Sequence, residues 1–246
     1  MPIIYLSPST QEKNLFVNGG TEEEYMNKIA DAMEPYLTSS GIRYVRNTPD
    51  MTAASSIRAS NAGQYDLHLA LHSNAAPEGR YGQVQGSVVF YYPGSERGRR
   101  AAEIVAENLR SIYPQPQLVR AEPTTAIGEV RQVRAPSVFI EFAFHDNVND
   151  ANWIKNNIEL IAQNVVLSLT EYFGIPFLTP VPARAAIVDI GWGHLNIRSR
   201  PDRNAPILAQ AADGARLTIL NQWQNWYLVQ FDHLIGYVFQ DYVTLV

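Results

Sequence analysis

The chain has 246 residues, of which 46% are hydrophobic and 17% charged, so it is long enough for two globular domains and too apolar for a disordered protein. Its formal net charge of −5 argues against a nucleic-acid-binding surface, and the absence of cysteine excludes disulfide bonds and cysteine-ligated zinc. No apolar run reaches the roughly 18 residues that span a membrane, and the short apolar start, without basic residues, predicts no signal peptide.

Residues 1–174 alternate between strand-like and helix-like patterns. A short apolar strand is expected at residues 3–6. Apolar residues then recur with helical spacing from Thr21, which forms a capping-box pattern with Glu24, as far as Gly41. Further strands are expected at 42–45, 66–71, 84–91 and 137–141, and further helices at 56–62, 98–112 and 150–173. This alternation predicts an α/β domain with a mostly parallel sheet flanked by helices.

The composition changes after residue 174. Residues 175–184 contain several prolines and predict a stiff, extended linker. Beyond the linker the helical period disappears, and short alternating segments appear at 195–198, 216–220, 226–231 and 236–238, separated by turn residues. Residues 185–246 therefore predict a small all-β barrel.

The barrel segments resemble bacterial SH3-like domains, beginning with Leu195-Asn196-Ile197-Arg198-Ser199-Arg200-Pro201 and continuing through Asn225-Trp226-Tyr227 and Gly236-Tyr237-Val238. The resemblance implies a module that binds cell-wall peptides. Trp226 and Tyr237 are equally well explained as core residues of a small barrel. Trp192 and Trp223 are expected to be more exposed and are candidates for a ligand groove.

Two polar residues stand at the ends of predicted core strands, where sites form in parallel α/β sheets. His72 closes the strand in Asp66-Leu67-His68-Leu69-Ala70-Leu71-His72-Ser73-Asn74-Ala75, and Glu141 closes the apolar run that starts at Pro136. A carboxylate at the end of a buried strand is costly unless it is paired or functional.

Both segments resemble the zinc-dependent N-acetylmuramoyl-L-alanine amidases. In that family a strand closing on Ser-Leu-His-Ala-Asn supplies a zinc ligand, which corresponds to His72. The stretch from Pro136 to Asn147 resembles the family segment whose glutamate is the catalytic acid/base, which assigns that role to Glu141. The resemblance also implies a zinc-binding glutamate four residues before an asparagine at the start of the first helix. Glu23 stands four residues before Asn27, although three adjacent acidic residues also complement the helix dipole.

The chain departs from the family at the first zinc ligand. The family has a histidine in a Gly-rich loop after the first strand, whereas this loop begins Ser7-Pro8-Ser9 and contains no histidine. His68 lies about 13 Å from His72 along the same strand, at ~3.3 Å per residue, and is expected in the core. We expect His145 to replace the missing ligand. Gln11, through its side-chain oxygen, is the rival, and loss of metal binding is the third possibility.

Arg131 falls where the family has a basic residue and is a candidate for binding substrate, and it is equally well explained as a solvated charge. The resemblance implies a hydrolase that uses zinc to cleave the bond between N-acetylmuramic acid and L-alanine in peptidoglycan, acting outside the cell or in the wall. Its partners would be peptidoglycan and its stem peptides. Two alternatives are an inactive wall-binding protein on an amidase fold and a zinc peptidase that cuts within the stem peptide.

Overall fold

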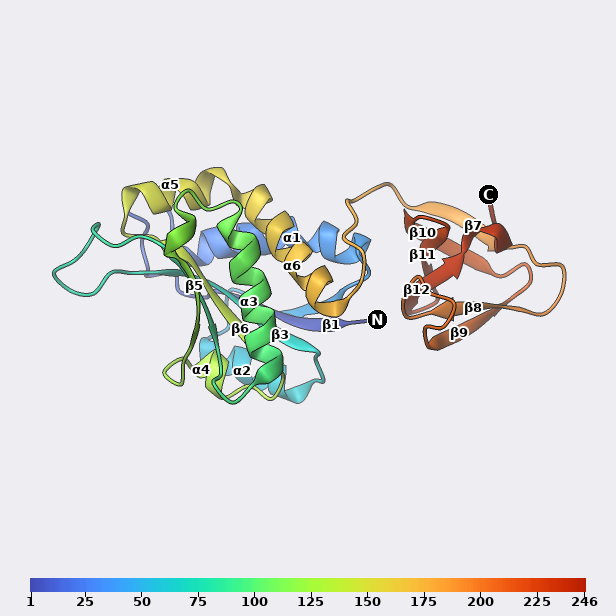
Figure 1. Ribbon diagram of the computed structural model, residues 1–246, viewed down its shortest axis with the longest axis horizontal. Coiled ribbons are helices and arrows are strands. Elements are labelled where there is room, and N and C mark those ends of the chain that lie inside the picture. The colour runs from blue at the N-terminus through green and yellow to red at the C-terminus, as the bar shows by residue number, and fades with distance from the viewer. The chain divides into compact units, whose positions relative to one another are not determined.

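The computed structural model describes all residues from 1 to 246, and Figure 1 shows its helices and strands. The chain divides into two compact units. The larger contains residues 3–34 and 44–172, and the smaller contains residues 1–2, 35–43 and 173–246. This division does not follow single cuts in the sequence, so the boundaries expected at 1–174, 175–184 and 185–246 stay a prediction.

A sheet of mixed direction forms the centre of the α/β part. Its strands are β1 (Ile3–Pro8), β2 (Arg43–Arg46), β3 (Leu67–Asn74), β4 (Ser87–Tyr91), β5 (Val119–Pro123) and β6 (Ser137–Phe144), in the order β2-β1-β3-β6-β4-β5. Strands β1, β3 and β6 run parallel to one another, whereas β4 is antiparallel to β6. Parallel β1, β3 and β6 therefore bring their carboxyl ends to one edge of the sheet.

Helices flank this sheet (Figure 1). They are α1 (Glu22–Ser39), α2 (Ala53–Ala62), α3 (Glu96–Arg110), α4 (Gly128–Arg131), α5 (Val148–Asn156) and α6 (Ile158–Phe173), with a short 3-10 turn, η1 (Pro116–Leu118), before β5. Nearly every residue of β1, β3 and β6 is buried. Such burial is expected of central strands covered on both faces, and it confirms the predicted α/β fold with a mostly parallel, helix-flanked sheet.

Three features of this part were not predicted. The sequence pattern predicts no strand at β5 and no helix at α4. It also predicts one helix from residue 150 to residue 173, where the structure has α5 and α6 separated at Asn157. The backbone N–H of Asn157 donates to the carbonyl of Ile154, and this hydrogen bond caps the C-terminal end of α5.

The C-terminal part is a seven-stranded antiparallel sheet. Its strands are β7 (Arg184–Val188), β8 (His194–Arg198), β9 (Ile207–Ala212), β10 (Arg216–Trp223), β11 (Trp226–Phe231), β12 (Leu234–Phe239) and β13 (Val243–Leu245), with η2 (Gln240–Tyr242) before the last. Their order is β13-β7-β10-β11-β12-β8-β9. This arrangement is consistent with the predicted SH3-like barrel.

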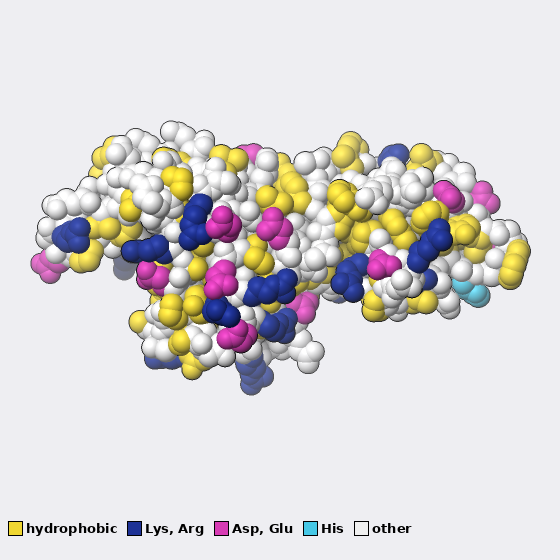
Figure 2. Space-filling view, in the orientation of Figure 1, with side chains coloured by type: hydrophobic (Ala, Val, Ile, Leu, Met, Phe, Trp, Pro, Cys, Tyr) yellow, Lys and Arg dark blue, Asp and Glu magenta, His cyan; other side chains and the backbone are white.

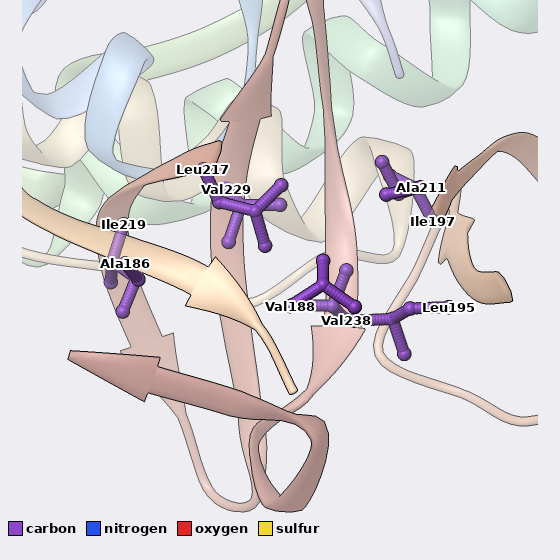
Figure 3. Packing of buried hydrophobic residues seen from close by; sticks show 9 residues of the cluster. All are labelled: Ala186, Val188, Leu195, Ile197, Ala211, Leu217, Ile219, Val229 and Val238. Atoms are coloured by element: carbon purple, nitrogen blue, oxygen red, sulfur yellow. The ribbon is translucent and has the colours of Figure 1, made fainter. Parts of the chain in front are cut away.

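Small and branched apolar residues fill the centre of this sheet (Figure 3). The buried cluster consists of Ala186, Val188, Leu195, Ile197, Ala211, Leu217, Ile219, Val229 and Val238. Trp226 and Tyr237 are buried as well, whereas Trp192 is 87% exposed and Trp223 is 39% exposed. Trp226 and Tyr237 therefore stabilise the fold, whereas Trp192 and Trp223 are accessible to a ligand.

The surface carries charges of both signs. On the face shown in Figure 2, acidic and basic side chains lie interspersed and form no broad patch of one sign. None of the helices combines the length and apolar character that a membrane crossing requires.

Candidate functional site

His72 lies near the carboxyl end of β3 and is the centre of a buried polar cluster. It is opposite Glu141 in the register between β3 and β6. Its ring stacks on Phe139, two residues before Glu141 on β6, with the ring centroids 4.1 Å apart. Only 5% of His72 is exposed, so its two ring nitrogens must find partners within the protein.

Glu22 supplies the first of these partners. As the first residue of α1 it projects toward β3, and its Oε1 lies 2.7 Å from Nδ1 of His72. Its other oxygen accepts a hydrogen bond from Nδ2 of Asn14 at 2.6 Å. Burial by itself would raise the pKa of Glu22, but the hydrogen bond and charge of His72, together with hydrogen bonds from Asn14 and Ser9, outweigh it and hold the pKa below its ordinary value.

Gln11 approaches the same ring nitrogen from the loop after β1. Its Nε2 lies 3.3 Å from Nδ1 of His72, and its Oε1 accepts a hydrogen bond from Asn14 at 3.0 Å. The backbone bond from Ser9 N to Leu71 O, 2.9 Å long, keeps the start of this loop beside β3. His72, Glu22 and Gln11 thus converge on one point.

Glu129 of α4 faces the opposite side of the His72 ring. Its Oε2 lies 3.4 Å from Nε2 of His72, an ion-pair separation without the alignment of a hydrogen bond. Its Oε1 accepts a hydrogen bond from the Ser7 hydroxyl at 2.6 Å and lies 3.2 Å from Nε2 of His68. The sequence analysis did not identify Glu129, because a single glutamate in an unpredicted one-turn helix carries no signal of its position.

The charges in this cluster shift one another's pKa values. Burial opposes the charged form of His72, but its contacts with Glu129 and Glu22 raise the pKa to about 10. Burial likewise opposes ionisation of Glu129, but the two histidines lower its pKa to about 2. The imidazole of His72 is therefore held between two carboxylates.

Glu141 differs from the two other glutamates because its carboxyl group has no partner of opposite charge in contact. Its Oε2 is buried and makes no hydrogen bond. Burial raises the pKa of Glu141 to about 8, with a lowering contribution from His72 and a raising one from Glu22. A carboxyl group with such a pKa is largely protonated at neutral pH and can act as an acid or a base.

The structure does not bring the other predicted residues to His72. Glu23 is half-buried, and only its backbone carbonyl makes a hydrogen bond, to Asn27 at 2.8 Å. His145 directs its Nδ1 at the hydroxyl and the backbone carbonyl of Ser73, at 3.0 and 3.1 Å. Arg131 is exposed on α4. Across the chain, no three histidine, aspartate or glutamate side chains converge to hold a metal ion.

A pocket of about 390 Å³ opens beside the His72 ring. It extends between the loop after β1 and the start of α2. Its lining combines polar and apolar groups and consists of Ser7, Pro8, Ser9, Thr10, Gln11, Asn47, Met51, Thr52, Ala53, Ser56, His72 and Glu129. A buried histidine and carboxylate at the end of an open pocket have the form of a hydrolytic site.

Two family models match the chain. Residues 9–171 match the model described as N-acetylmuramoyl-L-alanine amidase, and residues 193–244 match the model described as bacterial SH3 domain. The first match contains the whole polar cluster around His72 except Ser7. No curated protein matches the chain.

Solved structures share the fold of the α/β part at low sequence identity. The amidase AmiC2 of Nostoc punctiforme is 14% identical, with a TM-score of 0.63 over 70% of this chain and 97% of its own. CwlV of Bacillus (Paenibacillus) polymyxa is 12% identical, with a TM-score of 0.61 over 72% and 100%. Ami1 of Mycobacterium smegmatis is 15% identical, with a TM-score of 0.60 over 70% and 97%.

Proposed function

Because the chain belongs to the N-acetylmuramoyl-L-alanine amidase family, whose model matches residues 9–171, we propose that it is a zinc-dependent enzyme that cleaves one amide bond of peptidoglycan. This bond joins the lactyl group of N-acetylmuramic acid to L-alanine of the stem peptide. The observation that carries the proposal is the protonatable carboxyl group of Glu141, which faces His72 across adjacent parallel strands.

Zinc is the metal that the family generally uses, and the residues around Nδ1 of His72 fit it. Nδ1 of His72 and Oε1 of Glu22 are 2.7 Å apart and share a proton. Zinc would replace this proton, and the two atoms would move apart to bind it. An imidazole and a carboxylate are both zinc ligands, and catalytic zinc sites take three protein groups. We assign the role of third zinc ligand to Gln11, whose amide group already lies beside Nδ1 of His72. Rotation of this amide by 180° would exchange its nitrogen for its oxygen, which could then bind the metal.

His145 receives less support as the third ligand. Its imidazole is buried, bonded to Ser73 and packed on Phe16, with ring centroids 5.7 Å apart. Reaching His72 would require these contacts to break. Gln11 needs only a rotation of its terminal amide, although its bond to Asn14 would then be lost.

The bound zinc would act as a Lewis acid that polarises the scissile carbonyl and activates water. Glu141 then accepts a proton from the attacking water and donates one to the leaving nitrogen of L-alanine. Only the ionised form of Glu141 can accept this proton, and a pKa of about 8 leaves a minor ionised fraction at neutral pH to do so. Gln11 and Ser9 line the pocket through which the substrate would approach.

We assign the binding of cell-wall peptides to the SH3-like part. A second pocket of about 620 Å³ lies on this part, and its lining contains Trp192, Arg198 and Arg203 but no acidic residue. The arginines complement the free carboxylates of stem peptides. With such a module the enzyme would act at the wall, outside the cytoplasm.

Hydrolysis of a soluble muropeptide tests the catalytic proposal. The wild-type chain with added zinc should release the peptide from N-acetylmuramic acid, and Glu141→Gln should lower kcat by about 100-fold or more. The variant should keep the wild-type circular dichroism spectrum, because the amide has the same size. Near-normal turnover by Glu141→Gln would remove this residue from the mechanism.

One observation favours a second candidate function, an inactive wall-binding protein. The loop after β1 has no histidine where the family has its first zinc ligand. Under this alternative the wild-type chain would bind peptidoglycan without cleaving it and would bind no zinc. Zinc titration of the purified chain separates the two functions.

A further inference from the structure

A buried carboxylate links the two histidines of β3. His68 and His72 lie on the same face of the strand, four residues apart, and Glu129 lies between them. Oε1 of Glu129 is 3.2 Å from Nε2 of His68, and its Oε2 is 3.4 Å from Nε2 of His72. His68 is fully buried, and 4% of Glu129 is exposed. His68 is buried in the core, as the sequence predicts, and it also contacts the same carboxylate as His72.

Further contacts hold Glu129 in this position. The hydroxyl of Ser7, on β1, donates to Oε1 at 2.6 Å, and the hydroxyl of Ser60, on α2, lies 3.0 Å from Nδ1 of His68. The hydroxyl of Ser137, on β6, donates to the backbone carbonyl of Glu129 at 2.7 Å. A carboxylate buried this deeply is costly unless its oxygens are satisfied, and groups from several elements satisfy them here.

The two sides of the His72 ring have different neighbours. Nδ1 faces Glu22 and Gln11, the groups assigned to the metal. Nε2 pairs with Glu129 and has no hydrogen bond to any other group. Stacking on Phe139 restricts rotation of the ring out of this plane. A neutral imidazole has a lone pair on one nitrogen, which can bind a metal ion, and a proton on the other, which can be donated to a carboxylate.

We propose that Glu129 is a positioning residue, whose carboxylate pairs with the protonated Nε2 of His72 and so keeps the Nδ1 lone pair directed at the metal position between Glu22 and Gln11. This inference rests on the proposed zinc site. Carboxylates that bind the second nitrogen of a metal-ligating histidine fix its tautomer and strengthen its bond to the metal. His68, Ser7 and Ser60 in turn hold the carboxylate of Glu129.

Calorimetric zinc titration of the metal-stripped full-length chain tests the inference. Glu129→Gln should weaken zinc binding by about 10- to 100-fold, the usual effect of removing such a partner. Glu34→Gln is the matched control, because it neutralises another partly buried carboxylate of the α/β part, which pairs with Arg46 and makes no contact with His72. This control should bind zinc within about twofold of the wild type, since its partners lie outside the metal site. Circular dichroism verifies that each variant is folded at the temperature used.

Each result is decisive. Wild-type affinity in Glu129→Gln would overturn the positioning role and leave the zinc site intact, whereas no zinc binding by the wild type would overturn both. If Glu129→Gln does not fold, Ser7→Ala removes one donor to Glu129 and leaves its charge in place. Ser7→Ala should then weaken zinc binding several-fold, and an unchanged affinity would overturn the proposal.

Discussion

Three glutamates surround the His72 imidazole, and their surroundings give them different protonation states. Glu22 and Glu129 each pair with the ring, and these contacts lower their pKa values. Glu141 has no such pair, and burial raises its pKa to about 8. When neighbouring carboxyl groups have different pKa values, the group with the raised pKa is the candidate acid/base residue, and those with lowered pKa values are candidate charged ligands.

The raised pKa of Glu141 predicts a stability that depends on pH. In the unfolded chain this carboxyl ionises near its ordinary pKa of 4.5, whereas in the folded chain it stays protonated up to about pH 8. Between these values the folded state binds the extra proton, so the contribution of Glu141 to stability falls as pH rises and is constant above pH 8. Glu141→Gln cannot ionise, so its urea midpoint should rise relative to that of the wild type between pH 5 and pH 8. A midpoint difference that does not change with pH would show that Glu141 ionises normally in the folded protein.

Neighbouring glutamates at the start of α1 should differ in zinc binding. Glu22 contacts His72 at 2.7 Å, whereas the side chain of Glu23 makes no such contact. Glu22→Gln should therefore weaken zinc binding by at least about 10-fold, because a zinc ligand loses its charge. Glu23→Gln is the matched control and should retain wild-type affinity. The opposite order of the two affinities would return the ligand role to Glu23, as the resemblance to the family implies.

The sequence could place a glutamate ligand only to within a residue at this position. Successive helix positions are rotated by about 100°, so the three glutamates of the first turn point in different directions. The packing of α1 against the sheet decides which of the three glutamates contacts His72. This packing cannot be read from the sequence of the helix alone. Glu129 was beyond prediction for a similar reason, since it reaches His72 only through the fold.

At the scale of elements, Asp150 in the first turn of α5 joins segments that are distant in sequence. Its carboxylate accepts hydrogen bonds from the backbone N–H of Phe144 at the end of β6, at 3.0 Å, and of Gly86 before β4, at 3.1 Å. The hydroxyl of Tyr113, which follows α3, donates to it at 2.6 Å. The site strand β6 is therefore held at its carboxyl end by this one side chain.

Asp150→Asn should lower the free energy of unfolding by about 3 kcal/mol, because the amide presents N–H groups to donors and leaves buried groups unsatisfied. Thermal or urea denaturation of the α/β part measures this loss. The exposed Asp50→Asn provides the control and should change stability by less than about 0.5 kcal/mol. Equal stability of Asp150→Asn and the wild type would show that Asp150 does not anchor β6.

Strongly patterned elements were predictable from sequence, and marginal ones were not. The central strands β1, β3 and β6 are apolar runs, and α1 has a clear helical period, so their existence followed from local residues. Strand β5 reads Val119-Arg120-Ala121-Glu122-Pro123 and alternates too weakly to be recognised. It forms because β4 pairs with it along five consecutive residues.

At the scale of the whole molecule, the catalytic cluster and the SH3-like match lie in different stretches of the chain. We predict that a shortened chain ending at Phe173 stays folded and cleaves soluble muropeptides. It should bind whole sacculi less tightly than the full chain, because it lacks the aromatic and arginine-lined pocket. Co-sedimentation with sacculi measures binding. Trp192→Ala in the full chain is the finer control, and undiminished binding by both variants would refute the targeting role.

Peptidoglycan digestion tests the central claim most directly, through the identity of the new amino terminus. Purified peptidoglycan incubated with the wild-type chain and zinc should release peptides whose new amino-terminal residue is L-alanine, identified by dansylation and mass spectrometry. Glu141→Gln at the same concentration should release about 100-fold fewer of them. New amino groups on residues within the stem peptide would show a peptidase, and the absence of any new amino group would show that the fold does not catalyse amide hydrolysis.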